Sequence, residues 1–342
     1  MFAFPIREFG IDQLQQVELP TPQLLPGAVL IRIHAVSLNF RDLMMVKGLY
    51  NPKMALPRIP CSDGAGEVVA VGEGVTRVQT GDRVCGIFMQ RWLDGPLSAD
   101  KTKQALGGDT DGMLTEYALL HQDGVIRFPG HLSYEEAATL PCAALTAWNA
   151  LQHAGAPASP AQSGDTVLIQ GTGGVSIFAL QFARALGLSV IGTSSSDDKL
   201  ARARTLGLAE GFNYKQHPDW SKWATEITAG KGPDRIIEVG GAGTFAQSLR
   251  AVSTGGLIAQ IGVLSGAATA EPVALTPLLH KQIRVQGIYV GSRAMFEQMN
   301  AFISKAALHP VIDRTFAPNE IREAFHHMES ASHFGKIVIR MT

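Results

Sequence analysis

Apolar and polar positions follow two different rhythms along the chain. In its first part, short runs such as "AVLIRIHAVSL" and "GEVVAVGEGV" alternate apolar with polar residues and are separated by glycine-containing turns. An apolar period of two over short runs is typical of half-buried strands. From Ala28 to about Val125 the sequence therefore predicts a compact, mostly β domain, in which the polar, glycine-rich stretch 92–112 forms a loop.

Past Pro141 apolar runs alternate with helical patterns. "TVLIQ", "SVIGT" and "RIIEV" are each followed by a helical stretch, and "LIAQI" comes after them. Strands that alternate with helices build βαβ units, and hence a parallel sheet with helices on both faces. We expect a further strand in "RVQGIYVG", a long helix after it, and a tail strand "GKIVIR" that returns to the first domain. The predicted fold class is α/β: a doubly wound parallel sheet plus a β-rich domain.

Length and composition limit the classes of protein that this chain can represent. Its 342 residues exceed one ordinary core, so we expect two domains with a ligand cleft between them. The net charge of −1 gives no bulk attraction to nucleic acid or to an anionic membrane. No apolar run reaches spanning length, and "MFAFPIREFG" lacks the features of a signal peptide. Three widely separated cysteines suit a reducing compartment, so a cytoplasmic location without disulfides is expected.

A glycine-rich segment, "GTGGVS", lies between a predicted buried strand and a helix. Gly171, Gly173 and Gly174, followed by Val175, allow a tight turn at which a phosphate can approach the N–H groups of a helix N-terminus. Ser176 stands where a third glycine is usual, so a plain strand–helix turn is the alternative interpretation. The βαβ context favours a dinucleotide site.

Three hydroxyl residues end the second strand of this unit: Ser194, Ser195 and Ser196. Folds that prefer NAD usually place an acid there, which binds the ribose 2′-OH. Hydroxyl groups, with Lys199 one helical turn later and Tyr214 after the next strand, suit a 2′-phosphate instead. Asp197 and Asp198 argue the other way, but we interpret Asp197 as a helix N-cap or first-turn acid. The sequence therefore favours NADPH over NADH.

Other cofactor-binding candidates follow later strands, at the carboxyl edge where such sheets bind ligands. They are Gly240, Gly241, Gly262, Val263 and Leu264. Thr146, at the start of the helix that links the domains, is expected to reach the nicotinamide. For any single glycine the alternative is turn geometry alone.

The ordered segments "GEVVAVGEGVTRVQTGDRV", "EEAATLPCAALTAWNAL" and "VLIQGTGGVSIFALQ" resemble the medium-chain dehydrogenase/reductase (MDR) superfamily over nearly the whole chain. The resemblance implies a GroES-like catalytic domain, residues 1–141 and 291–342, around a Rossmann domain, residues 142–290. It also implies a homodimer, in which "RVQGIYVG" pairs with its copy at the sheet edge.

The same resemblance shows which positions would hold zinc ligands. Asn39, Ser62 and Cys142 stand where the alcohol dehydrogenases of the superfamily bind catalytic zinc, and an amide and a hydroxyl are poor zinc ligands. The loop 92–112 holds no cysteine for a structural zinc. We therefore expect no zinc and interpret Cys142 as a buried packing residue. "NFRDLMMVKGLY" and "HFGKIVIR" are similar to the zinc-independent branch, which includes quinone oxidoreductases and 2-enoyl reductases.

Without a metal, a plain ketone lacks the electrophile that polarises its oxygen. A quinone, or an alkene conjugated to a carbonyl, accepts hydride more readily because the charge spreads to an oxygen that hydrogen bonds can stabilise. We therefore expect NADPH-dependent reduction of such a small-molecule acceptor. The alternatives are an alcohol or aldehyde dehydrogenase of the same superfamily, and a protein that binds NADPH without turnover.

The catalytic candidates lie in "NFRDLMMVKGLY". Asn39 would donate to the substrate oxygen or the nicotinamide ribose, Asp42 would orient Arg41 or the ribose, and Tyr50 matches the proposed proton donor of the enoyl reductases. Each has a structural alternative. Asn39 can satisfy backbone groups in a turn, Asp42 can cap a helix, and Tyr50 can simply pack.

Overall fold

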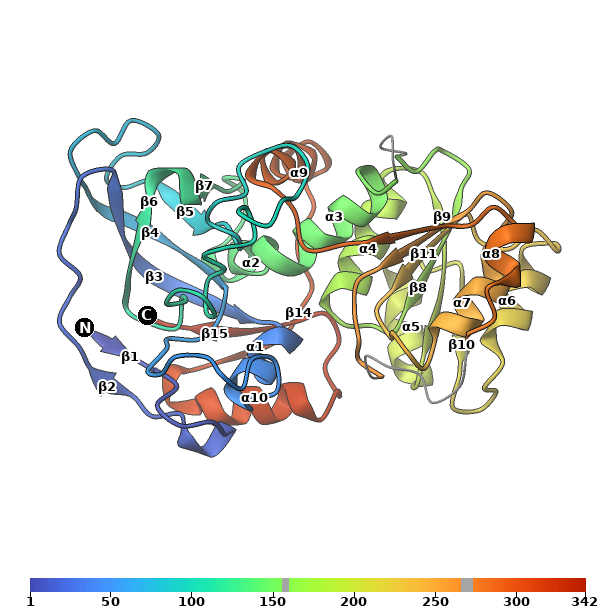
Figure 1. Cartoon of the computed structure of the whole chain (residues 1–342), viewed down its shortest axis with the longest axis horizontal. Coiled ribbons are helices and arrows are strands. Elements are labelled where there is room, and N and C mark those ends of the chain that lie inside the picture. Colours follow the sequence, from blue (N-terminus) through green and yellow to red (C-terminus); the bar gives the residue numbers. More distant parts are fainter. Residues whose placement is uncertain (156–159, 266–272) are drawn as a thin grey trace. The chain divides into compact units, whose positions relative to one another are not determined.

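The computed structural model describes residues 1–155, 160–265 and 273–342. The chain folds into two compact units, residues 1–145 with 290–342, and residues 146–289 (Figure 1). The first unit therefore contains both ends of the chain. Within the described residues, no helix is long and apolar enough to cross a membrane.

A seven-stranded sheet forms the centre of the first unit, with the order β14-β15-β3-β4-β5-β7 and β6 paired to β3. Its strands are β3 (Ala28–Leu38), β4 (Asp63–Val71), β5 (Arg83–Gly86), β6 (Tyr117–His121), β7 (Val125–Arg127), β14 (Ile312–Phe316) and β15 (Lys336–Arg340). A two-stranded pair is separate, β1 (Phe2–Ala3) and β2 (Val17–Glu18). The tail strand β15 runs antiparallel to β3, with Ile337 opposite Leu38. This pairing places Lys336 next to Leu38, near the start of helix α1 (Phe40–Val46).

The α-helices of this unit are short apart from α9. They are α1 (Phe40–Val46), α2 (Tyr134–Ala138), α9 (Arg293–Ala306) and α10 (Ile321–Glu329). Single turns add η1 (Ile11–Gln13), η2 (Gln122–Gly124), the π-helical η3 (Leu140–Ala144) and η4 (Pro318–Glu320). As predicted, the stretch 92–112 contains no helix or strand.

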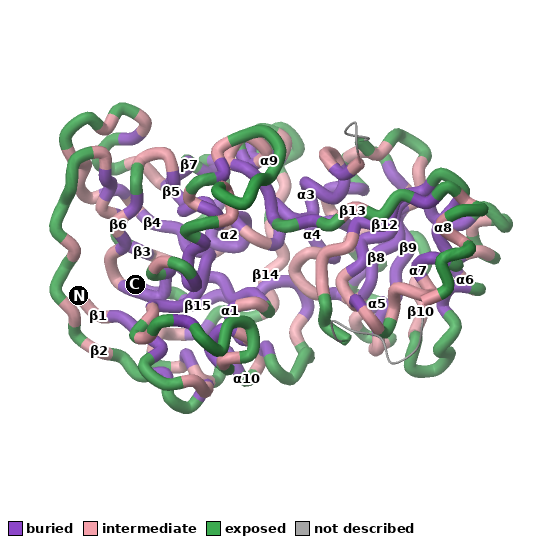
Figure 2. The backbone as a smooth tube through the Cα atoms, in the orientation of Figure 1, coloured by how far each residue is buried: buried purple, intermediate pink, exposed green. Residues whose placement is uncertain are grey.

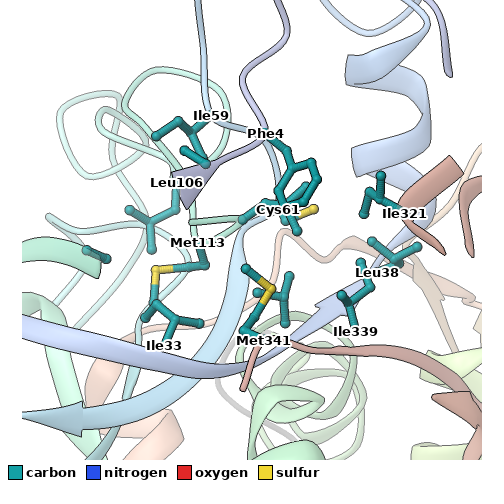
Figure 3. Close-up of a cluster of buried hydrophobic side chains, with 14 of the residues drawn as sticks. Phe4, Ile33, Leu38, Ile59, Cys61, Leu106, Met113, Ile321, Ile339 and Met341 are labelled. Carbon is teal, nitrogen blue, oxygen red and sulfur yellow. The ribbon is translucent and has the colours of Figure 1, made fainter. Parts of the chain in front are cut away.

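Apolar positions at helical and strand spacing form one core in the first unit. On α10 the residues Ile321, Ala324, Phe325 and Met328 are buried, which is the spacing of one helix face. Figure 3 shows Ile321 close to Leu38 and Ile339, which come from β3 and β15. Apolar packing thus fixes β15 and the end of β3, which directly precedes the catalytic candidate Asn39.

The second unit is a six-stranded, all-parallel sheet of order β10-β9-β8-β11-β12-β13. Its strands are β8 (Thr166–Gln170), β9 (Ser189–Ser194), β10 (Glu210–Asn213), β11 (Arg235–Glu238), β12 (Leu257–Gln260) and β13 (Arg284–Gly287). In chain order this is 3-2-1-4-5-6, the doubly wound order of dinucleotide-binding folds. The central strand β11 is buried throughout, as expected of a parallel sheet covered on both faces.

Helices connect these strands, as the sequence pattern predicted. The connecting helices are α4 (Gly174–Ala185), α5 (Asp197–Thr205), α6 (Trp220–Ile227), α7 (Phe245–Ala251) and α8 (Thr276–His280), and α3 (Leu145–Gln152) precedes β8. The edge strand β13 and helix α8 are mostly exposed (Figure 2). The predicted fold class, a β-rich domain with a doubly wound parallel sheet, is confirmed.

Candidate functional site

The carboxyl edge of the parallel sheet brings together three of the predicted cofactor segments. The chain leaves β8 towards β9 but leaves β11 towards β12, so the loops after the neighbouring strands β8 and β11 diverge. Such a switch in strand order is where open α/β sheets bind ligands. Residues 171–175, 240–241 and 262–264 follow β8, β11 and β12 respectively. Thr146 is buried near the start of α3 (Leu145–Gln152).

The glycine turn after β8 has the space and the geometry for a phosphate. Gly171 has φ +68°, in the left-handed region, and Gly173 is the N-cap of α4. A Cβ added at either residue would meet no atom within 4 Å. The Ser176 hydroxyl donates to the Gln170 carbonyl at 2.6 Å, which explains how a side chain is accommodated at the usual third glycine. The open turn below free helix N–H groups fits a dinucleotide pyrophosphate.

A buried carboxylate, Glu238, organises the loop after β11. It is fully buried, and its Oε1 accepts hydrogen bonds from the N–H groups of Gly240 and Gly241 at 2.9 and 3.0 Å. Its Oε2 accepts from the Gln170 side-chain amide at 2.7 Å. Gln170 directly precedes the glycine turn, so Glu238 links two of the cofactor segments. Glu238 was not predicted from the sequence, although a charge near the end of the apolar run "RIIEV" was a signal for it.

The loop after β12 is tied to the loop after β11 by Ser265. The Ser265 hydroxyl donates to the Gly240 carbonyl at 2.7 Å and accepts from the Gly243 N–H at 2.8 Å. A Cβ at Gly262 would lie 2.1 Å from the Val239 carbonyl oxygen, so only glycine fits there. The following residues, 263 and 264, are exposed. They are therefore accessible at the sheet edge.

The end of β9 carries hydroxyl groups that also shape the next helix. Ser194 is buried, and its hydroxyl accepts from the Ser196 N–H at 3.3 Å. Ser196 is the N-cap of α5 and accepts from the Lys199 N–H at 3.4 Å. Ser195 is partly exposed between them. The three serines are thus held in a fixed turn.

Asp197 begins α5, but neighbouring side chains already bind its carboxylate. It accepts from the Asn213 amide at 3.0 Å and from the Gln216 amide at 2.7 Å. The N-cap position belongs to Ser196, so Asp197 is a first-turn acid. Tyr214, next to Asn213, is exposed.

In the first unit, the catalytic candidates surround the start of α1. Asn39 is its N-cap, and the Asn39 N–H donates to the Asp42 carboxylate at 2.9 Å. Asp42 is fully buried, and burial raises its pKa to about 6 although the Arg41 guanidinium lies 3.7 Å from its Oδ1. The structural role considered for Asp42, as a helix cap, is therefore present.

Tyr50 lies at the surface, and its ring packs near the guanidinium of Arg41. Tyr50 is 49% exposed, and the Arg41 guanidinium lies 5.7 Å from its ring centre. Phe88 flanks the same guanidinium at 4.9 Å, and Arg41 donates to the Leu106 carbonyl at 2.6 Å. Arg41 thus holds the loop that contains Leu106 against α1.

The Asn39 side chain is hydrogen-bonded to a buried lysine. Its amide oxygen accepts a hydrogen bond from the Lys336 ammonium at 2.6 Å. Lys336 also donates to the Leu38 carbonyl at 2.7 Å and is buried. The amide nitrogen of Asn39 faces the Ser62 hydroxyl at 3.5 Å. Lys336 was missed in the sequence, where a lysine at the start of the apolar tail strand was the only signal.

The network continues from Ser62 through a buried carboxylate. The Ser62 hydroxyl donates to Asp63 Oδ1 at 2.7 Å, and the Cys142 N–H donates to Asp63 Oδ2 at 3.1 Å. Burial raises the pKa of Asp63, opposed by the charge of Lys336. Burial and the Asp63 carboxylate together raise the pKa of the Cys142 thiol. The residue as a whole is partly exposed, whereas its thiol lies in buried surroundings, and its interpretation as a packing residue stays a prediction.

The three positions that resemble zinc ligands are therefore neighbours, but they hold an amide, a hydroxyl and a thiol. Across residues 1–155, 160–265 and 273–342, no group of three or more histidine, cysteine or acidic side chains is placed to bind a metal ion.

Two family models match the chain. "Alcohol dehydrogenase GroES-like domain" matches residues 25–130, and "Zinc-binding dehydrogenase" matches residues 174–305. A zinc-type alcohol dehydrogenase-like protein of Schizosaccharomyces pombe is 43% identical over 335 residues, which cover 97% of this chain and 96% of the yeast protein. The chain belongs to the MDR superfamily. This MDR protein has a GroES-like domain and a Rossmann-like domain, and it is an NAD(P)-dependent, alcohol dehydrogenase-like oxidoreductase.

Two further relatives place the MDR protein within its superfamily. A Sinorhizobium meliloti protein classed with the alcohol dehydrogenases has a solved structure with a TM-score of 0.90 and 40% identity, covering 99% of this chain and 98% of its own. A quinone oxidoreductase of Pseudomonas aeruginosa is 30% identical, covering 92% of this chain and 91% of its own. The alcohol dehydrogenase-like relatives are thus more similar than the quinone oxidoreductase. They favour the alcohol dehydrogenase alternative over the predicted quinone reduction.

Proposed function

We propose that this MDR protein uses NADPH to reduce a carbonyl-conjugated C=C bond or a quinone without a metal ion. The observation that carries the proposal is the contact of the Lys336 ammonium with the Asn39 amide oxygen at 2.6 Å. A metal ion bound at Asn39 would need this same oxygen, and it would meet a buried positive charge there.

The other two positions that resemble zinc ligands, Ser62 and Cys142, also argue against a metal ion. Ser62 already donates its proton to Asp63, and neutral hydroxyl and amide groups are weak ligands for zinc. Zinc binds the thiolate form of cysteine, whereas burial and the Asp63 charge favour the protonated form of Cys142. These residues do not fit a catalytic zinc ion.

The residues at the end of β9 support NADPH as the cofactor over NADH. Three hydroxyl residues and Lys199 stand there, and Asp197, the acid that begins α5, is bound to the amides of Asn213 and Gln216. An acid held by two donors is less available to accept from a ribose 2′-OH, while hydroxyl and ammonium groups suit a 2′-phosphate. When bound, NADPH supplies the hydride.

The polar groups of the first unit would stabilise the negative charge that develops on the substrate and supply the proton. Hydride addition to the β-carbon of an enone places negative charge on the carbonyl oxygen. The Asn39 amide N–H would donate to that oxygen, and the exposed Tyr50 hydroxyl would give the α-carbon its proton. The balance is one NADPH and one proton consumed for each C=C bond reduced.

The proposal is tested by following NADPH absorbance with chelator-treated protein and three acceptors: a 2-alkenal, a 1,4-quinone and a saturated aldehyde. We expect oxidation with the first two and not with the third. Activity only with the aldehyde, or only after zinc is added, contradicts the proposal. Tight NADPH binding with no oxidation by any acceptor would indicate a binding protein instead.

A second candidate function is the oxidation or reduction of a simple alcohol or aldehyde. The observation in its favour is the 43% identity to a zinc-type alcohol dehydrogenase-like protein. The saturated aldehyde in the panel, tested with and without added zinc, separates this candidate from the first.

We also propose that the MDR protein is a homodimer formed along β13. This strand ends the parallel sheet, so one side of its backbone is unpaired within the sheet. Val285 and Tyr289 on this segment are exposed, as are Leu275 and Leu279 at helix α8. An exposed edge with apolar neighbours is suited to pairing with a second copy. Light scattering at micromolar concentration should give the mass of two chains, and a monomer would refute the proposal.

A further inference from the structure

We infer that Lys336 supplies the positive charge that activates the acceptor, and that it acts through the side chain of Asn39. The inference rests on the proposed reduction of a conjugated acceptor and names the charged group behind it. Lys336 would be a positioning residue, because it touches Asn39 and not the substrate.

The first observation is that the ammonium is buried and fixed. Lys336 is 3% exposed, and lysine is almost never fully buried without a partner. Two neutral oxygens, of Leu38 and Asn39, accept from Nζ at 2.7 and 2.6 Å. Short hydrogen bonds from a charged donor to fixed acceptors leave the ammonium little freedom.

The second observation is that no carboxylate bonds to this ammonium directly. Among the residues that the structure describes, no Asp or Glu oxygen lies within 4.0 Å of Lys336 Nζ. Asp42 and Asp63 are buried nearby, and burial raises the pKa of both. The ammonium therefore bonds directly to an amide oxygen and to no carboxylate, although its charge also acts on Asp63.

The amide transmits this charge to its other end. A cation that donates to an amide oxygen polarises the group, and polarised groups in a chain of hydrogen bonds become stronger donors. The Asn39 nitrogen lies 3.5 Å from the Ser62 oxygen, longer than an ordinary N–H···O bond of about 2.7–3.2 Å. The Asn39 side chain also hydrogen-bonds to the Asp63 carboxylate, which opposes the rise of its pKa, so the N–H that faces Ser62 is the weakly held one of the two. A substrate carbonyl oxygen at this nitrogen would accept a stronger bond than an ordinary asparagine gives.

When bound, NADPH would supply the hydride for the new C–H bond at the β-carbon, and the C=C electrons would move to the carbonyl oxygen. The oxygen gains negative charge, which the Asn39 N–H and the Lys336 charge behind it stabilise. The C=O bond re-forms when the α-carbon takes a proton. The products are NADP⁺ and the saturated carbonyl compound.

The test is Lys336→Met measured on acceptors of graded reactivity, a 2-alkenal and a 1,4-quinone. A quinone needs less polarisation, so we expect kcat to fall about 100-fold with the alkenal and less than about tenfold with the quinone. The Kd for NADPH should change less than about twofold, because the cofactor turn lies in the other unit. An equal loss with both acceptors, or a change in KM alone, overturns the inference.

Two variants keep this test decisive. Lys47→Met is the matched control, because Lys47 pairs with Glu329 at the surface of the same unit, and it should leave both rates unchanged. Asn39→Ala keeps Lys336 and must reproduce the acceptor-dependent pattern, even if Lys336→Met fails to fold. If the unaltered protein reduces neither acceptor, the proposed function fails; if it reduces both and the variants lose rate uniformly, only the role of Lys336 fails.

A metal-binding measurement gives a readout independent of turnover. The double variant Asn39→Cys with Ser62→His restores the thiol and imidazole that zinc prefers. With the ammonium in place it should retain little zinc, and adding Lys336→Met should raise zinc towards one ion per chain. Equal zinc content in the double and triple variants, whether high or low, contradicts the idea that the ammonium occupies the place of a cation.

Discussion

The side-chain amide of Gln170 donates to the Glu238 carboxylate at 2.7 Å, across the two central strands of the parallel sheet. The same carboxylate accepts from the N–H groups of Gly240 and Gly241. The loops after β8 and β11, which carry cofactor candidates, are therefore set by one buried charge.

Glu238→Gln should weaken NADPH binding and lower the melting temperature. The new amide brings N–H donors towards donors, and an unsatisfied buried group costs about 1–3 kcal/mol. We expect the free energy of unfolding to fall by about 2 kcal/mol and the Kd for NADPH to rise at least about tenfold. Denaturant unfolding and fluorescence titration measure the two effects. Glu226→Gln, at an exposed Lys222 pair, is the control, and equal behaviour of the two variants would be evidence against this role.

Gly173→Ala separates the cofactor role of the glycine turn from its folding role. The added Cβ meets no protein atom within 4 Å, so stability should change by less than about 1 kcal/mol. The methyl group would instead occupy the space proposed for the pyrophosphate, and the Kd for NADPH should rise at least about tenfold. Gly130→Ala also meets open space and should leave NADPH binding unchanged. Unaltered affinity in Gly173→Ala would place the pyrophosphate elsewhere.

The preference for NADPH can be reversed at the end of β9. Ser195→Asp puts a negative charge where the 2′-phosphate is proposed to bind, so kcat/KM for NADPH should fall at least about tenfold while that for NADH is kept or rises. Steady-state rates with both cofactors measure the ratio. Asp197→Asn is the control, because Asp197 is bound to Asn213 and Gln216. A large change of the cofactor ratio in this control would identify Asp197 as the ribose-binding acid.

Asp42 should make the stability of the protein depend on pH. Burial raises its pKa to about 6 from an ordinary value of 3.8. Between these values the native state keeps a proton that the unfolded chain has released, so the stability contribution of Asp42 falls as the pH rises through this window. The loss approaches about 3 kcal/mol. Asp42→Asn removes this pH dependence. In urea unfolding at pH 4 and pH 7, the free energy of unfolding of the variant relative to the unaltered protein should therefore rise with pH. A constant difference would contradict the assigned pKa.

The local parts of the fold could be predicted from the sequence. The apolar run "TVLIQ" matches β8 (Thr166–Gln170), and the glycine turn follows it directly. The segment "RVQGIYVG" was less accurate, because β13 ends at Gly287 and Val290 has φ +57°. A left-handed residue ends a regular strand, and a β-branched residue seldom signals it in advance.

The site could be predicted only where its residues are neighbours along the chain. Asn39, Asp42 and Tyr50 fall in one segment, and the serines after β9 fall in another. The Lys336 contact joins residues 297 positions apart, and it arises because β15 pairs with β3. Glu238 reaches Gln170 in the same way, through strand pairing. No local pattern encodes such pairs, so the sequence analysis named neither Lys336 nor Glu238.

The central claim, reduction without a metal ion, is tested most directly by measuring bound zinc and turnover on the same sample. Chelator-treated protein should contain almost no zinc and still oxidise NADPH with a 2-alkenal at the rate of untreated protein. Adding zinc should leave this rate unchanged. Loss of the activity in proportion to the zinc removed, with recovery when zinc is restored, would contradict the metal-free mechanism and the role assigned to Asn39 and Lys336.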